Sequence, residues 1–321
     1  MTVILDLEVR IGKDVKGEVF YDKKLPNALR AAQKYAADSG TFVANMPLLL
    51  KQFPHKEWYT ANSEEHSGID KYGRFVKRGG YVVITLHGGK EGIGLLTPEV
   101  LEKAYDMKKR NKGVIKKLYA AKFNDLFDGK DVLTTLIYGR GMPDGSPILV
   151  IPYSQLVNEG SPGGYQRYAV VRPLELARKT DSGYKSIDRL TNGKGKVTDS
   201  QVITYAGGVK EGQNVIDRAI KNFKSGKLRV SHPFNSKNFD PNEPQGRLLF
   251  LNPFDYGGLI GDNDLNNYGR VVGVVPEAHG KKSIAAPKLE QILAIIYSSE
   301  DIDQEKKVPL ANKILELYNP H

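Results

Sequence analysis

The feature that most constrains the fold of this chain is a stretch that occurs twice. Residues 83–92 read VITLHGGKEG and residues 202–212 read VITYAGGVKEG. The two copies share Val-Ile-Thr, a Gly-Gly pair and Lys-Glu-Gly once one inserted residue, Val209, is allowed. In each copy an apolar, β-rich run leads into a glycine turn and then into a helical pattern. A repeat with so long a period is typical of a duplicated domain rather than of a short solenoid unit.

Weaker matches extend the repeat in the same order. Residues 100–104 (VLEKA) correspond to 215–219 (VIDRA), 69–71 (IDK) to 187–189 (IDR), and 47–50 (PLLL) to 173–176 (PLEL). The sequence therefore predicts a mixed α/β (or α+β) fold of two similar domains from an internal duplication. Each domain is expected to contain a buried strand, a Gly-rich turn and a helix.

A chain of 321 residues is also the length expected for about two domains. The best linker candidate is the glycine- and proline-rich stretch NEGSPGG at residues 158–164. We therefore expect a strand and helix extension of the first domain at 1–40, a first repeat domain at 41–157, a linker at 158–166, and a second repeat domain with C-terminal helices at 167–321.

Composition narrows the classes of function. The chain has no cysteine, which excludes disulfides, thiolate metal ligands and cysteine nucleophiles. The first residues lack the features of a signal peptide, and no run approaches the roughly 18 apolar residues of a membrane span, so we expect a cytoplasmic protein with no membrane partner. The net charge of +10 favours a polyanionic partner, either nucleic acid or a nucleotide. A solvated basic surface without a specific partner is the alternative.

Local patterns predict the main elements. Alternation over residues 2–10 predicts an opening strand, and residues 27–37 read as a helix that Ser39-Gly40 ends. The continuous apolar run 81–86 predicts a strand buried on both faces, and Thr97-Pro98-Glu99 is typical of a helix start. Residues 201–205 are expected to form the second central strand. Residues 55–67, which include Trp58 and several polar residues, are expected to form a loop.

The two glycine turns are the main candidate ligand-binding sites. A turn that opens a helix presents free backbone N–H groups and the positive end of the helix dipole, and both attract phosphate or carboxylate. Neither turn matches a P-loop or a dinucleotide fingerprint, and a glutamate in each would oppose a bound anion. Turns kept only for packing are the alternative interpretation. The candidate residues are Gly88, Gly89 and Lys90 in the first turn and Gly207, Gly208 and Lys210 in the second.

His87, at the end of the first apolar run, is the candidate catalytic residue, and its counterpart in the second copy is Ala206. As a histidine beside a glycine turn it could act as an acid or base on a small substrate, in the first half only. The His-Gly-Gly triplet has no G-x-S-x-G elbow to accompany it, so a purely structural histidine is the alternative. No stretch predicts a metal site, and the cofactor stays open.

Basic residues interleaved with aromatics form the last candidate set. Arg74 and Arg78 precede the 81–86 strand, and Arg167 follows the linker. Such arginines would meet phosphates while exposed aromatic rings stack on bases, although alternating core and solvated residues explain the pattern equally well. The favoured hypothesis is a duplicated protein that binds a polyanion through its basic surface and paired glycine loops. The alternatives are a small-substrate enzyme that uses His87 and a structural, self-assembling protein that forms homo-oligomers.

Overall fold

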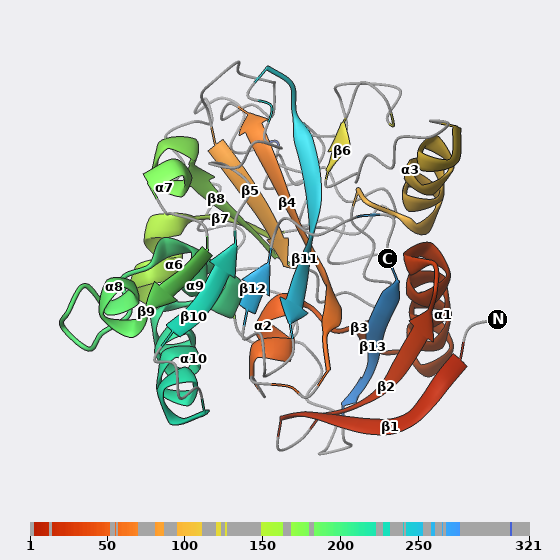
Figure 1. The fold of residues 1–321 in the computed structure, drawn as a ribbon, viewed down its shortest axis with the longest axis horizontal. Coiled ribbons are helices and arrows are strands. Elements are labelled where there is room, and N and C mark those ends of the chain that lie inside the picture. Colours follow the sequence, from red (N-terminus) through yellow and green to blue (C-terminus); the bar gives the residue numbers. More distant parts are fainter. Residues whose placement is uncertain are drawn as a thin grey trace. The chain divides into compact units, whose positions relative to one another are not determined.

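The computed structural model describes residues 3–12, 15–51, 55, 57–69, 81–86, 95–110, 120–122, 126, 149–162, 168–179, 183–222, 227–231, 240, 242–252, 258–260, 265, 268–276 and 309. The chain divides into two compact units, Met1–Glu277 and Ala278–His321. Every strand and helix whose bounds follow lies in the first unit (Figure 1).

A smaller sheet carries the N-terminus of the chain. Its described strands run in the order β1 (Val3–Gly12), β2 (Val15–Asp22), β13 (Gly269–Pro276) and β3 (Phe42–Val43), all antiparallel. Helix α1 (Leu25–Ser39) packs closely on one face, because a Cβ at Gly269 would lie 2.7 Å from Ala28 and one at Gly273 would lie 2.6 Å from the ring of Tyr35. The opening strand and the helix predicted from the sequence are both confirmed, and Gly40 ends α1 in the left-handed conformation.

A larger sheet carries the rest of the unit. In the described residues its order is β7 (Leu149–Pro152), β8 (Tyr168–Pro173), β5 (Tyr81–Leu86), β4 (Tyr59–Ile69), β11 (Gln245–Asn252), β12 (Gly258–Ile260), β10 (Lys227–Ser231) and β9 (Gly183–Ser186), with β6 (Ala121–Lys122) also paired to β11. The β7–β8 and β10–β12 pairs are parallel and the others are antiparallel. The predicted strand 81–86 is confirmed as β5, between β4 and β8.

Short helices connect the strands. They are α2 (Met46–Leu50), α3 (Pro98–Arg110), α6 (Tyr153–Glu159), α7 (Leu174–Lys179), α8 (Ile187–Thr191), α9 (Ser200–Ala206) and α10 (Val209–Asn222). Thr97 accepts a hydrogen bond from the backbone N–H of Val100 at the start of α3, as its sequence predicts. Among the described residues, no helix is long and apolar enough to cross a membrane.

Strand β11 has a hydrophobic cluster on each side of it. Leu248 and Phe250 belong to a buried cluster that includes residues of α1 and α3, whereas Leu249 and Leu251 belong to one that includes residues of α2, α9 and α10. Because both sides are covered, β11 is buried almost along its whole length. The neighbouring strand β4 is buried as well, including its polar side chains.

Residues 59–69, most of which the sequence analysis placed in a loop, form the strand β4 instead. Glu64, Glu65 and His66 are all at most 2% exposed. The carboxylate of Glu64 accepts hydrogen bonds from the backbone N–H groups of Leu95 and Leu96 and lies 2.9 Å from Nε2 of His66. The loop expectation was wrong because these side chains are satisfied inside the protein rather than by water.

On the other side of β4, Glu65 joins a buried charge network. Its carboxylate lies 3.4 Å from a guanidinium nitrogen of Arg172 on β8, and accepts hydrogen bonds from Gln201 (3.4 Å) and Tyr205 (3.3 Å) of α9. Arg247, the cross-strand neighbour of Glu65 on β11, is buried with it. Burial raises the pKa of Glu65, while the two nearby guanidinium groups act in the opposite direction.

Residues 201–205 were also predicted wrongly, because the expected second central strand is part of the helix α9. Asp199 caps this helix by accepting hydrogen bonds from the backbone N–H groups of Gln201 and Val202, both at 3.0 Å. Its other carboxylate oxygen lies 2.7 Å from the buried Lys185. The same Val-Ile-Thr triplet is therefore a strand in the first copy and a helix in the second. The mixed α/β class is confirmed, and the internal duplication is not.

The expected linker, residues 158–166, separates β7 from β8, and these two strands pair in one sheet. The described residues on both sides of it belong to the same compact unit, whose end is at Glu277. The repeat domains at 41–157 and 167–321 and the extension at 1–40 stay a prediction.

Candidate ligand-binding site

The second glycine turn connects the helices α9 and α10. The backbone N–H of Gly208 donates to the carbonyl of Ile203 at 2.9 Å, and that of Gly207 donates to the carbonyls of Ile203 and Thr204 at 3.1 and 3.3 Å. The Gly208–Ile203 and Gly207–Thr204 hydrogen bonds are those of a Schellman motif, which closes α9. Gly207 has φ +87° and Gly208 has φ +146°, values that residues with a Cβ rarely adopt. The glycine pair is therefore required by the backbone path itself.

The turn is also tightly packed. A Cβ at Gly207 would lie 3.0 Å from the hydroxyl of Tyr168, and a Cβ at Gly208 would lie 2.8 Å from Oε2 of Glu211. Glu211 is the third residue of α10, so its carboxylate folds back over the N-terminus of its own helix, as in a capping box. The Glu211 side chain thus partly neutralises the positive end of α10.

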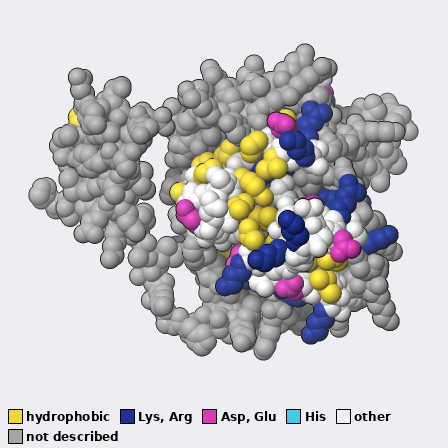
Figure 2. Space-filling model, turned by 90° about the vertical axis from the view of Figure 1, so that its left-hand side faces the viewer, with side chains coloured by type: hydrophobic (Ala, Val, Ile, Leu, Met, Phe, Trp, Pro, Cys, Tyr) yellow, Lys and Arg dark blue, Asp and Glu magenta, His cyan; other side chains and the backbone are white. Residues whose placement is uncertain are grey.

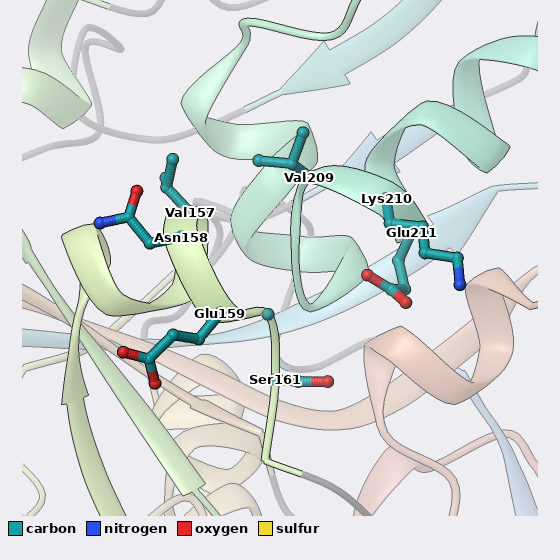
Figure 3. A pocket seen from close by; sticks show the side chains of 8 residues that line it. Val157, Asn158, Glu159, Ser161, Val209, Lys210 and Glu211 are labelled. Carbon is teal, nitrogen blue, oxygen red and sulfur yellow. The ribbon is translucent and has the colours of Figure 1, made fainter.

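A pocket of about 400 Å³ lies beside this turn. It is lined by the end of α6 and the residues after it, together with the first turn of α10: Val157, Asn158, Glu159, Gly160, Ser161, Val209, Lys210 and Glu211. The close view shows Ser161 and the Glu211 carboxylate on the same side of the pocket, while Asn158 and Glu159 extend away from them (Figure 3). Its volume is in the range of pockets that hold small molecules.

The hydroxyl of Tyr168 is the second polar feature of this region. Tyr168 is 4% exposed, and its hydroxyl has no hydrogen-bond partner of normal geometry among the described residues. Burial raises the pKa of Tyr168, and the nearby Glu211 carboxylate adds to that rise, whereas the Ser161 side chain lowers it. Both neighbours line the pocket, so the buried Tyr168 hydroxyl lies directly behind its wall.

The stretch of sequence that contains α9 and α10 is basic. Residues 183–231 carry ten Lys and Arg against four Asp and Glu, a local excess of +6. One cation, Lys185, is buried against Asp199. The exposed ones are Arg189, Lys194, Lys196, Lys210, Lys221 and Lys227. On this side of the molecule, Lys and Arg lie beside a band of hydrophobic side chains (Figure 2).

Of the residues predicted from the sequence, the structure describes only those of the second turn. Gly207, Gly208 and Lys210 lie at one end of the pocket, with the glycines shaping the turn and Lys210 in the lining. The other candidates lie outside the described residues: His87, Gly88, Gly89, Lys90, Arg74, Arg78 and Arg167. The chemistry expected of the first turn and of His87 therefore stays a prediction.

Sequence reasoning missed the other half of the pocket. Ser161 fell within the expected linker and Tyr168 shortly after it, and neither was among the predicted site residues. The signal in the sequence was the glycine-rich stretch 158–164, whose first residues now line the pocket. A linker and a binding loop share the same turn chemistry, so composition alone does not distinguish them.

The protein has a mixed α/β fold, and this fold is similar to the C-type lectin fold. A solved structure from the work "Accommodation of massive sequence variation in Nanoarchaeota by the C-type lectin fold" is similar to it, with a TM-score of 0.50 and 20% sequence identity. The similarity covers 83% of this chain and 100% of that one. No family model matches the chain, and no curated protein matches it. At this identity the likeness concerns the fold alone.

Proposed function

We propose that this protein binds a phosphorylated ligand, with the pocket at the start of α10 holding one phosphate and the surrounding basic face attracting a longer polyanion such as single-stranded nucleic acid. The observation that carries the proposal is the pocket itself, which combines Lys210, the N-terminus of a 14-residue helix and the hydroxyl of Ser161. Phosphate oxygens accept hydrogen bonds from each of these groups.

The negative charges beside the turn, which oppose an anion, fit a binding site of moderate affinity. The Glu211 carboxylate occupies the position over Gly208 that an anion would approach, and the negative end of α9 meets the same turn. A phosphate would therefore displace Glu211 rather than enter a free site. In this proposal the basic residues of the segment assist binding, since the field of a +6 segment favours the exchange.

The pocket favours binding over catalysis. The described residues of its lining include no histidine, and their carboxylates belong to Glu159, which points away, and to Glu211. The similar solved structure is described as accommodating massive sequence variation on its fold. We regard the fold of the present chain in the same way, as a rigid scaffold whose surface carries the binding residues. Catalysis by His87 and self-assembly remain alternative proposals.

The test is fluorescence anisotropy of short labelled single-stranded DNA and RNA over a series of salt concentrations. Lys210→Ala should weaken binding and reduce the slope of log affinity against log salt by about one unit. Glu211→Gln should tighten binding, because it removes the competing carboxylate without shortening the side chain. Unchanged affinity in both variants would refute the pocket assignment.

The matched control is Lys34→Ala. Lys34 is 76% exposed on α1 and forms a surface pair with Asp38, so its removal changes the net charge equally but at another element. If Lys34→Ala weakens binding as much as Lys210→Ala does, the affinity comes from net charge and the pocket has no role.

A further inference from the structure

A cluster of aromatic residues surrounds one arginine on the smaller sheet. Arg270 of β13 pairs across the sheet with Tyr21 of β2, and its guanidinium lies 5.3 Å from the ring centre of Tyr21 and 5.8 Å from that of Trp58. Tyr268, two residues before Arg270, lies 6.5 Å from Tyr21 at an angle of 37°. We call Tyr21, Trp58, Tyr268 and Arg270 the Arg270 cluster. Nothing in the pocket at α10 involves these residues.

The rings are held in place and yet remain accessible. Arg270 is only 13% exposed and also pairs with Glu57 at 3.4 Å, so its guanidinium is fixed between the rings. Tyr268 is 49% exposed, and Tyr21 and Trp58 are half-buried. A ligand that stacks on this surface would therefore order few side chains, which keeps the entropic cost of binding low.

The arginine decides what kind of ligand fits. Aromatic faces normally attract cations, but here the protein's own guanidinium already occupies that role. A cation behind the rings draws their π electrons inward, which makes the outer faces less attractive to a second cation and more attractive to a flat π system. Because Glu57 balances Arg270, the cluster adds no net charge. It suits a neutral planar ring rather than a phosphate.

We infer that the Arg270 cluster is a stacking platform for a nucleobase. The inference rests on the proposed function, because it makes the polyanion a single-stranded nucleic acid whose exposed bases stack while its phosphates meet basic residues. Stacking of one base on an aromatic side chain commonly changes affinity by about tenfold or more. The cluster would supply this contribution regardless of base sequence, since every base has a π face.

Trp58 makes the inference directly measurable, because it is the one tryptophan of the sequence. A base that stacks on the cluster should change Trp58 fluorescence, so we would titrate the full chain with oligothymidylate, with an abasic sugar-phosphate oligomer of equal length, and with adenosine. Quenching by oligothymidylate and by adenosine, without quenching by the abasic oligomer, is the expected result. Equal quenching by the abasic oligomer, or no quenching by oligothymidylate and adenosine, would overturn the nucleobase assignment.

Variants separate this inference from the proposed function. Tyr268→Ala should weaken oligothymidylate binding by about tenfold, measured by anisotropy, whereas Tyr268→Phe keeps the ring and should bind normally. If Tyr268→Ala binds like the parent protein while Lys210→Ala is weakened, the platform is refuted and the pocket stands. If Tyr268→Ala is weakened and Lys210→Ala is not, the pocket is refuted and the platform stands.

Discussion

The replacement Arg172→Met probes the charge network at the centre of the larger sheet. The Arg172 side chain is fully buried and lies 3.4 Å from the Glu65 carboxylate, with further hydrogen bonds to Gln201 at 2.8 Å and Ser200 at 3.3 Å. At that separation, and with an effective dielectric constant of about 20, the attraction between the two charges is about 5 kcal/mol. Methionine fills a similar volume without the charge, so Glu65 loses one of its two nearby cations.

We expect Arg172→Met to lower the free energy of unfolding by about 3–5 kcal/mol at about pH 8. The size of this loss depends on pH, because removal of Arg172 raises the pKa of Glu65 further in the folded state while the unfolded value stays near 4.5. Glu65 already has a raised pKa in the folded parent protein, so the window lies between that value and the still higher value in the folded variant, where the variant holds a proton that the parent has released. The difference in stability from the parent protein should therefore grow as pH rises through this window and become constant above it.

Urea unfolding followed by circular dichroism, at about pH 5 and about pH 8, measures this difference. Adding Glu65→Gln to Arg172→Met should recover stability at the higher pH, because it removes the buried carboxylate that has lost the positive charge of Arg172. Arg30→Met is the matched control, since Arg30 is 45% exposed and forms surface ion pairs with Glu99 and Glu102. The Arg30→Met replacement should lower the free energy of unfolding by less than about 1 kcal/mol. A loss for Arg172→Met that is equal at both pH values would refute an electrostatic origin.

Three further outcomes are expected in the same unfolding assay. Gly208→Ala should lose about 1–3 kcal/mol, and more than Gly40→Ala. Gly208 has φ +146° and its methyl group would lie 3.3 Å from the Gly160 backbone, whereas Gly40 has φ +65° and faces open space; equal losses would count against this argument. Asp199→Ala should lower the free energy of unfolding by more than the roughly 1 kcal/mol of an ordinary helix cap, because it also leaves the buried Lys185 without its partner. Ser186→Ala, which removes an exposed helix cap, is the comparison. His55 donates a hydrogen bond from Nε2 to a backbone carbonyl at 2.7 Å, and burial lowers its pKa below 6.5. The stability of the protein should therefore fall as pH drops below about 6.5, and His55→Gln should flatten that fall. An unchanged pH profile in the variant would contradict the assignment.

Elements with a strong local signal were predictable from the sequence. The opening strand, α1 and its terminal Gly40, the apolar strand β5 and the start of α3 at Thr97 all follow from periodicity and from capping residues. The glycine turn before α10 was found as well, together with Lys210. These features depend on interactions within a few residues, so they can be inferred without knowing what packs against them.

Two errors show where local reasoning fails. Val202-Ile203-Thr204 has β-rich composition, yet it is helical because Asp199 caps one end and the glycine pair closes the other. The polar strand β4 has no apolar alternation, yet it is buried because Glu65 meets arginines from β8 and β11. In the first case local capping outweighed the intrinsic preference of the residues, and in the second the tertiary environment did.

The sequence by itself determined the mixed α/β class, the excess of basic charge and the backbone requirement for glycine at the turn before α10, because these are set by composition and by short-range sterics. Only the tertiary structure decided that residues 158–161 face Lys210 across a pocket, that Tyr21, Trp58 and Tyr268 gather around Arg270, and that Glu65 lies between two arginines. These groups are far apart along the chain, and their meeting depends on the order and register of strands, which no local pattern specifies.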